Sequence, residues 1–394
     1  MKRRALLAML ILTVPMLPAA TSCAPRTERR VAEVADDPLQ AGWSFACGIT
    51  NDADDRAECQ EKIALAYLER GDSEKGLTLG GRIENWRKGV VLAEAATRLA
   101  QAGRTEEARR WVIEAEVIGR NIQDWQRDRI LARVAKTKAL LGQEDEVGRW
   151  SAFYRSNLDY RGELAAYHAL ALARAGDMTN ALTALGDLDD STHIDVSSWQ
   201  AHGYLLLARA GYLNGEKLTQ ALTKAWAAAA RVPGNKRPDV QWGLIMDAAA
   251  LGAREQALAW MEEASPVWQA WQAPAHLRVP VLARLAIAWG ALGRTENVVE
   301  CAREVESLIH QLQAIEQPAV FAMLGEAWAR MGDTQKALRC YEHAFEVTGQ
   351  LINPRPRAIA CVDICLSLER AGLRHRTVSE GLNRLLAGFG APHG

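Results

Sequence analysis

The sequence of 394 residues lacks the short motifs by which many enzymes are recognised. It has no phosphate-binding glycine loop, no helix with paired histidines for a metal ion and no Gly-x-Ser-x-Gly elbow. Its eight histidines are scattered, and its basic residues form no stripe of the kind that attracts phosphate backbones. We therefore expect a non-catalytic protein without cofactor, metal or nucleic acid. An enzyme with an unrecognised site is the less favoured class.

Phenylalanine and proline are also scarce, with 5 Phe and 13 Pro, whereas alanine is abundant and 13 Trp are present. A hydrophobic content of 49% is ample for a core. This composition favours packed helices over β-sheet.

The N-terminus differs in composition from the rest of the chain. Lys2, Arg3 and Arg4 precede an apolar run over residues 5–17, which is followed by small residues up to Cys23. The run is short and interrupted by prolines, which argues against a spanning helix. Residues 1–22 are therefore predicted to be a secretory signal. Without its three cations, 44 basic (47 − 3) and 48 acidic residues leave a net charge of −4.

The segment Ala20-Thr21-Ser22-Cys23 resembles a bacterial lipobox, in which the signal is removed before a cysteine that receives lipid. The match is imperfect, because the motif more often begins with Leu and has Gly or Ala before the cysteine. The resemblance implies a lipoprotein anchored through Cys23, and the absence of Asp after that cysteine favours the outer membrane or periplasm. Secretion after cleavage at the same bond and a cytosolic protein are the alternatives.

A turn peptide built around a glycine recurs along the chain at spacings of 32 to 41 residues. A repeat of this length is typical of a solenoid of helix pairs. Each first helix begins near a capping residue and an aromatic, as in Asn85-Trp86 and Asp124-Trp125, and ends at the turn glycine, where a left-handed residue reverses the chain. The turn glycines are Gly71, Gly103, Gly142, Gly176, Gly211, Gly252, Gly293, Gly332 and Gly372.

The repeat register shows in the position seven residues before each turn glycine, which is small in seven of nine units. The residues there are Ala64, Ala96, Ala135, Ala169, Tyr204, Ile245, Ala286, Gly325 and Cys365. Small residues are needed where two helices approach closely. Trp86 and Trp125 share another repeat position and are expected to staple neighbouring units together.

The unit around Gly332 resembles the tetratricopeptide repeat family. Phe321, Leu324, Gly325 and Trp328 would lie on its first helix, with Ala337, Tyr341 and Ala344 on the second. The resemblance implies an all-α, right-handed α-solenoid of about nine helix pairs over residues 43–387. Residues 23–42 would form the lipidated cysteine and a flexible tether, and residues 388–394 a tail.

The inner groove of such an array would be lined by the first helices. In the family, peptide clamps place Lys and Asn at groove positions. Ten residues before each turn glycine this chain has no Lys or Arg, so the carboxylate clamp is absent. The groove would be lined mostly by small, apolar residues with scattered charges, which suits a helix or an extended segment. Candidate groove residues are Lys136, Arg174, Trp242, Glu326 and Arg330.

Trp268 and Trp271 fit no repeat slot and fall between Pro266 and Pro274, in the longest predicted connecting loop. They are candidates for an exposed contact surface. The alternative is that they fold back to cover a helix end.

The cysteines divide by position. Cys47 and Cys59 flank a polar segment and are candidates for a disulfide in an oxidising compartment, worth roughly 3 kcal/mol. Cys361 and Cys365 lie one helical turn apart, and core packing is favoured there over a metal site.

These features predict a non-catalytic scaffold or adaptor, tethered in the bacterial cell envelope, that recruits another envelope protein. The alternative is a chaperone-like or ligand-carrier module that holds apolar segments in the groove.

Overall fold

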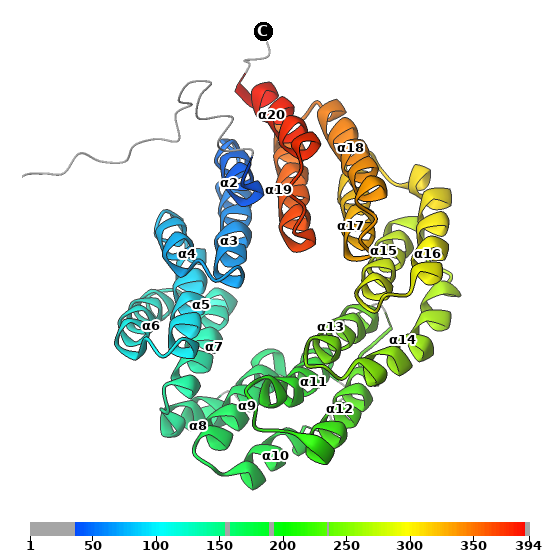
Figure 1. Cartoon of the computed structure of the whole chain (residues 1–394). Helices are drawn as coiled ribbons and strands as arrows, with labels where there is room; N and C mark the ends of the chain where they lie inside the picture. Colours follow the sequence, from blue (N-terminus) through cyan, green and yellow to red (C-terminus); the bar gives the residue numbers. More distant parts are fainter. Residues whose placement is uncertain (1–35, 154–157, 189–192, 235, 391–394) are drawn as a thin grey trace, which may run out of the picture.

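The computed structural model describes residues 36–153, 158–188, 193–234 and 236–390. Within these residues the protein is all-α, with helices packed in pairs as two layers (Figure 1). The inner layer comprises α3 (Ala53–Glu69), α5 (Arg87–Gln101), α7 (Asp124–Leu140), α9 (Leu158–Arg174), α11 (Ile194–Arg209), α13 (Arg237–Ala250), α15 (Ala275–Ala291), α17 (Gln317–Arg330) and α19 (Pro354–Ala371).

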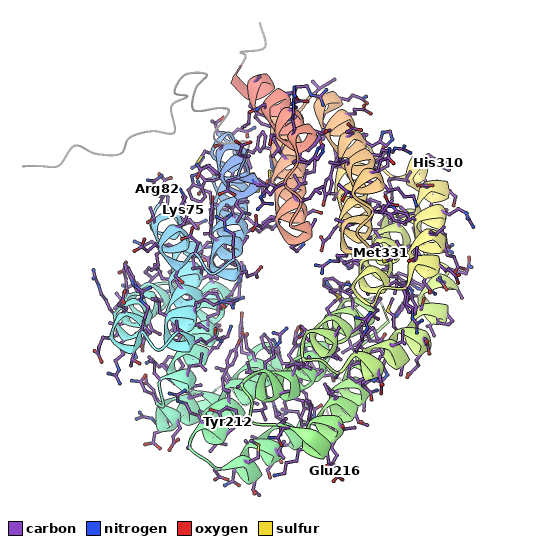
Figure 2. The ribbon with its side chains drawn as sticks, viewed as in Figure 1. Lys75, Arg82, Tyr212, Glu216, His310 and Met331 are labelled. Carbon is purple, nitrogen blue, oxygen red and sulfur yellow. The ribbon has the colours of Figure 1, made fainter. Side chains whose placement is uncertain are left out.

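The outer layer is formed by the second helix of each pair. Its members are α4 (Ser73–Gly80), α6 (Thr105–Arg120), α8 (Glu144–Phe153), α10 (Met178–Gly186), α12 (Gly215–Ala230), α14 (Arg254–Gln269), α16 (Thr295–Leu308) with the 3-10 turn η2 (Ile309–Gln311), and α18 (Thr334–Gln350). Helix α20 (Arg376–Gly390) follows α19 after the ninth turn glycine and packs against α18 and α2. Helix α2 (Pro38–Cys47) stands outside this alternation, because it precedes the first pair. Labelled side chains of the outer layer, such as Lys75, Arg82 and His310, lie on the outside of the molecule (Figure 2).

The turn glycines end the inner helices as predicted. All nine have positive φ angles, from 62° at Gly372 to 91° at Gly71. This left-handed conformation is one that glycine adopts without steric cost, so the chain can reverse within a short turn. The prediction of a helix pair at each glycine is confirmed.

The predicted register of the inner helices is also confirmed. The residues seven positions before the turn glycines are buried, with Ala64 and Ala96 both 0% exposed. At Gly325 a Cβ atom would lie only 2.7 Å from the ring of Tyr341 on the paired helix α18. A small residue is therefore required where α17 and α18 cross, because protein interiors have no spare room for an added carbon.

Aromatic rings join neighbouring units. The rings of Trp86 and Trp125 meet edge to face with centroids 5.1 Å apart, which confirms the predicted staple between two units. In the outer layer, Trp226 and Trp260 stack nearly parallel at 4.8 Å. These contacts add geometric specificity to the burial of apolar surface.

One core position carries a charge. Four residues before the turn glycine, other units have leucines such as Leu99 and Leu172, but α7 has Lys138, which is 5% exposed. Its Nζ lies 2.7 Å from Glu116 and also pairs with Glu146, and the Trp150 ring centroid is 4.7 Å away. Two carboxylates and a ring face therefore compensate this buried ammonium.

The two ends of the helical array meet, so that the molecule is a ring (Figure 1). Helix α2 packs against α19 on one side and α3 on the other. We call this junction the seam. Its packing includes Phe45 of α2 and Phe389 of α20, with ring centroids 5.3 Å apart. At Gly42 a Cβ atom would lie 3.2 Å from the Cβ of Cys365 on α19, so the two helices are in close contact.

Ion pairs also cross the seam. Arg70, the C-cap of α3, lies 3.1 Å from Asp37, which caps α2, and 3.7 Å from Glu369 of α19. Arg355 of α19 lies 3.2 Å from Asp52, the N-cap of α3, and also pairs with its neighbour Asp55. The contact between Arg355 and Asp55 thus joins two residues that are 300 positions apart in sequence.

The helices of the seam extend beyond two of the segment boundaries that were predicted from the sequence. The predicted tether extended to residue 42, but α2 begins at Pro38, and both Leu39 and Ala41 are fully buried. The predicted tail began at residue 388, but α20 continues to Gly390. Both segments are needed to close the ring. None of the described helices is long and apolar enough to cross a membrane.

Candidate functional site

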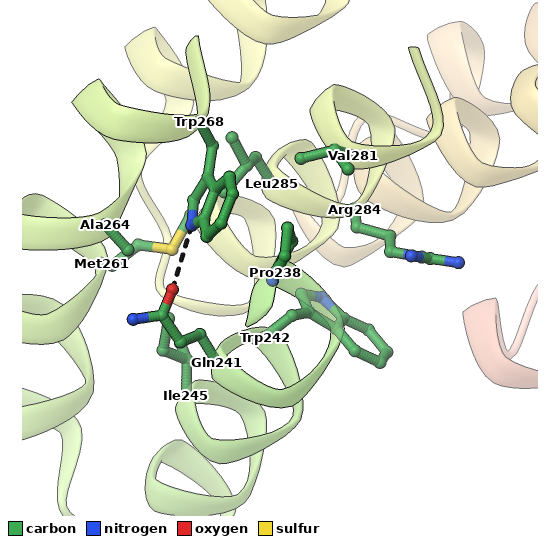
Figure 3. A pocket seen from close by; sticks show the side chains of 10 residues that line it. All are labelled: Pro238, Gln241, Trp242, Ile245, Met261, Ala264, Trp268, Val281, Arg284 and Leu285. Atoms are coloured by element: carbon green, nitrogen blue, oxygen red, sulfur yellow. Dashed lines mark hydrogen bonds between the residues drawn. The ribbon is translucent and has the colours of Figure 1, made fainter. Parts of the chain in front are cut away.

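The inner wall of the ring is the candidate site. Figure 3 shows Trp242 and Arg284 pointing away from Trp268, toward the space on whose far side the C-terminal helices are drawn in red. Arg284 lies nine residues before its turn glycine, and residues at the same repeat position share one face of their helices. We call this set the inner row: Lys62, Glu94, Arg133, Tyr167, His202, Gly243, Arg284, Met323 and Asp363.

The inner row is partly accessible. Tyr167 is buried, and the other eight residues are half-buried. The predicted groove position, one residue earlier in each unit, is different. Ala93, Ala166 and Ala283 at that position are 0% exposed, because they pack between adjacent inner helices. The prediction that these small residues line the groove is therefore wrong for the three alanines, because they are buried.

Ion pairs tie the first inner helices together. The carboxylate of Glu61 on α3 lies 2.8 Å from Arg87 of α5 and 2.5 Å from Arg129 of α7. Glu94 of α5 lies 3.1 Å from Lys136 of α7. The Glu61 side chain is only 3% exposed, so its charge depends on both guanidinium groups. Lys136 was predicted to line the groove, and the structure places it in this network.

The same arrangement continues around the wall. Arg209 of α11 pairs with Asp247 of α13, and Arg284 of α15 pairs with Asp239 of α13. Burial raises the pKa of Asp247, against the attraction of Arg209 and His202. These pairs are less buried than Glu61, and a ligand can therefore compete for their charges.

Glu326 of α17 lies 3.0 Å from both Arg330 and Arg370, the latter on α19. Its side chain is 2% exposed, so the predicted contact residue Glu326 is a structural carboxylate that orients two arginines. Arg330 keeps 28% of its side chain exposed and remains available to a partner. Arg174, another predicted groove residue, is exposed at the end of α9.

A polar and aromatic cluster lies where α9 meets α11. The Tyr167 hydroxyl donates a hydrogen bond to Glu163 at 3.1 Å, and its ring meets that of Trp199 at 5.6 Å. Burial raises the pKa of Glu163, against the nearby charge of Arg133. Burial also raises the pKa of Tyr167, together with the charge of Glu163. The carboxyl therefore favours its neutral form more than a surface glutamate does.

His202 continues this cluster toward α13. Its Nδ1 lies 2.8 Å from the carbonyl oxygen of Ser198, which can only accept a hydrogen bond. Nδ1 therefore carries a proton, and Nε2 is the nitrogen that lies beside Gly243 of α13. A Cβ atom built on Gly243 would be 3.8 Å from Nε2, so the absence of a side chain leaves that nitrogen approachable.

The two tryptophans predicted to form a contact surface are placed differently. Trp268 is 5% exposed, and its Nε1 donates to Gln241 Oε1 at 3.2 Å (Figure 3). The expectation of exposure is wrong for Trp268, because α14 continues past Pro266 and turns this ring into the core. Trp271 is half-buried, edge to face with Trp268 at 6.1 Å.

The space beside these rings is narrow. The cavity between α13, α14 and α15 has a volume of 10 Å³, enough for about one water molecule. Trp242 borders it and directs its ring to the inner wall (Figure 3). The accessible part of this region is therefore the Trp242 side that faces the ring interior.

Six cysteines lie among the described residues. Cys361 and Cys365 are fully buried, as predicted for core residues, and burial raises the pKa of both. No cluster of three metal-ligating side chains occurs among the described residues. Cys59 is a free thiol in this structure, and the sulfur of Cys47 accepts a hydrogen bond from Gln60 Nε2 at 3.7 Å. Burial raises the pKa of Cys59 to about 12, and the predicted disulfide stays a prediction. Cys23 lies outside the described residues.

Tyr167, His202 and Arg284 were not among the predicted contact residues. The signal that identifies them is the repeat register itself, counted nine residues before the turn glycine instead of ten. The arrangement offers paired charges, aromatic faces and one approachable imidazole nitrogen, which are groups that bind polypeptides.

No protein-family model matches the chain, and no curated protein matches it. One solved structure to which it is similar is described as a "circular tandem repeat protein with novel repeat topology and enhanced subunit contact surfaces". The identity is 13%, the match covers 92% of this chain and 82% of that one, and the TM-score is 0.21. At these values the match carries no argument, and the ring is established by the seam contacts given above.

Proposed function

We propose that the protein is a non-catalytic scaffold that holds a segment of a partner protein against its inner wall. The observation that supports this is the inner row, in which seven of the nine inner helices contribute a charged or aromatic residue to one side of the ring. Trp, Tyr and Arg are the side chains that most often anchor protein interfaces. Arg284 of the inner row and Trp242 beside that row supply two of these types on the neighbouring helices α15 and α13, whereas Tyr167 is buried.

The charge pattern favours a polypeptide with both signs of charge. The wall presents Arg–Asp pairs such as Arg209–Asp247 and Arg284–Asp239, which can exchange partners with a ligand's own charged groups. Such exchange gives specificity more than raw affinity, because each new pair replaces one already present.

We further propose the finer assignments that the sequence suggested. The helix pairs would be tetratricopeptide-like, about nine in number and right-handed in sense. The close contact between Gly325 and Tyr341 supports the likeness, since the family's pattern pairs a small residue with an aromatic there. The protein would be exported and anchored through lipid on Cys23, with a partner in the cell envelope.

A photo-crosslinking residue in the inner wall tests the proposed site. Benzoylphenylalanine would replace Met323, a half-buried member of the inner row, in the full chain expressed in its own cells. The matched control would place the same group at Ile113, which is 59% exposed on the outer helix α6. We expect a discrete partner to be crosslinked from Met323 and not from Ile113.

The outcomes separate the alternatives. A partner captured only from Ile113 would move the contact to the outer surface and refute the inner-wall site. A broad spread of proteins captured from Met323 would indicate the chaperone-like alternative. Loss of the Met323 product after Trp242→Ala and Arg284→Ala would place the contact on α13 and α15.

Lipid anchoring has its own test. Cys23→Ala should shift the protein from the membrane pellet to the supernatant after cell disruption, because the acyl chains supply the membrane affinity. A variant that remains in the pellet would contradict the anchor and leave the binding function open.

A further inference from the structure

A second surface lies on the outer layer, between α16 and α18. It is a groove with a volume of 410 Å³, and α17 forms its floor. The floor and sides are largely apolar, with contributions from Val299, Ala302, Phe321, Leu324, Trp328 and Cys340. The groove is separate from the inner row, because its walls belong to outer helices.

The groove exists because α17 packs closely along α18 and only sparsely along α16. The side of α17 that faces α16 therefore keeps apolar surface open, and Phe321 there is half-buried. An amphipathic segment of a partner could cover this surface by placing its apolar side chains on the floor.

The rim of the groove is predominantly basic. Arg303, Lys336, Arg339 and His343 line it, against the single acidic residue Glu306. All four basic residues are exposed. Lys336 Nζ lies 4.1 Å from the Trp328 ring centroid and 3.2 Å from Asp333. The His343 ring is 5.6 Å from Phe321, and its Nδ1 is 3.2 Å from Glu346.

Arg303 and Arg339 differ from Lys336 and His343, which each lie beside a carboxylate. Within the described part of the chain neither forms an ion pair, although most charged residues of the inner wall do. They lie on opposite sides of the groove, on α16 and α18. Two exposed guanidinium groups that form no ion pair of their own flank the apolar floor, although the charge of Arg339 also acts on Asp333. They match carboxylates carried by a ligand that also has apolar side chains.

We propose that this groove binds an acidic amphipathic segment of a partner protein, with apolar side chains on the floor and carboxylates on Arg303 and Arg339. The flanking helices contain 14 and 17 residues, so a helical segment of about 14 residues would match their length. The ring would then hold one protein at its inner wall and a second protein on its outside.

A randomised dodecapeptide library displayed on phage tests this proposal. Phage whose peptides bind the full chain would be selected first. Those that also bind the double variant Arg303→Glu/Arg339→Glu would then be removed, so that groove-dependent peptides remain. The matched control is Arg149→Glu/Arg384→Glu, which reverses two exposed arginines on α8 and α20. Because all four arginines are exposed, the variants should keep the wild-type melting temperature, and Arg303→Gln/Arg339→Gln provides a neutral replacement.

The proposal predicts groove-dependent peptides with acidic residues and apolar residues at helical spacing. Their affinity should fall at least about tenfold in the groove variant and stay unchanged in the control. They should also slow alkylation of Cys340, which lines the groove. The proposal is overturned if no peptide depends on the two arginines, if dependent peptides lack acidic enrichment, or if Cys340 is not protected. An Arg284→Ala variant should leave these results unchanged, which separates this groove from the inner wall.

Discussion

A single methyl group at Gly42 tests whether the ring is held closed by tight packing of α2. A Cβ atom at this position would lie 2.5 Å from Ile63 Cδ1 and 3.2 Å from Cys365 Cβ. Both neighbours are 0% exposed, so neither can move toward solvent. Gly42→Ala therefore forces α2 away from α3 or α19.

The magnitude follows from two opposing effects. Replacing a helical glycine by alanine stabilises the helix by about 1 kcal/mol. Adding a carbon to a filled core costs about 1–3 kcal/mol. We expect a net destabilisation of the seam by about 1 kcal/mol, which corresponds to a roughly fivefold change in the equilibrium between docked and detached α2.

Gly243→Ala is the matched control. This glycine also lies inside a helix, but its added Cβ would meet only His202 Nε2 at 3.8 Å, an ordinary contact. The same chemical change should therefore stabilise the protein by about 0.5–1 kcal/mol.

Amide hydrogen exchange measures both effects. Exchange within α2 should accelerate about fivefold in Gly42→Ala while α11 and α13 stay unchanged, and it should not accelerate in Gly243→Ala. If Gly42→Ala slows exchange as much as the control does, the seam is not closely packed and the reasoning fails.

Three further predictions concern buried polar groups. Burial raises the pKa of Glu163, so its ionisation costs stability as pH rises above the ordinary value of 4.5. Glu163→Gln should therefore raise the melting temperature at pH 7 but not at pH 4, and an equal shift at both would contradict this. Lys138→Met should destabilise by about 3 kcal/mol in urea unfolding, because Glu116 loses a buried partner. The double variant Lys138→Met/Glu116→Gln should recover part of the lost free energy of unfolding. Intact mass of the exported protein should rise on reduction if Cys47 and Cys59 are bridged, and an unchanged mass would refute the bridge.

The repeat architecture was predictable because it depends on local chemistry. Each turn needs one residue with positive φ, and glycine at Gly71 or Gly332 marks it directly in the sequence. Each close helix crossing needs a small residue, and Ala96 or Gly325 marks that as well. The turn glycine recurs in all nine units and the small residue in seven of them, so many weak signals combine into one reliable pattern.

The candidate site was harder to predict because a small error in register changes the face of the helix. Successive residues in an α-helix are rotated by about 100°. Counting ten residues before the turn selects Ala166, between helices, whereas counting nine selects Tyr167, in the inner row. The prediction that Trp268 is exposed was wrong because a proline was taken to end the helix. Pro266 suggested a loop, but the burial of Trp268 and its bond to Gln241 stabilise a helix that contains the proline.

The closure of the ring had no sequence signal. It depends on the sum of small rotations between successive helix pairs, to which irregular connections such as the one containing η2 also contribute. The residues that seal the ring, such as Asp37 and Arg355, look like ordinary surface charges until the ends are brought together.

Closure of the ring also constrains how the number of helix pairs can change during evolution. An open solenoid gains or loses a helix pair at modest cost, because its ends are free and only neighbouring contacts change. In a ring whose first and last helices share the Phe45–Phe389 and Arg70–Glu369 contacts, one added or deleted pair would displace both ends. Relatives with this architecture should therefore differ in loop length and side chains while keeping the number of pairs, and duplication of a single unit should be selected against.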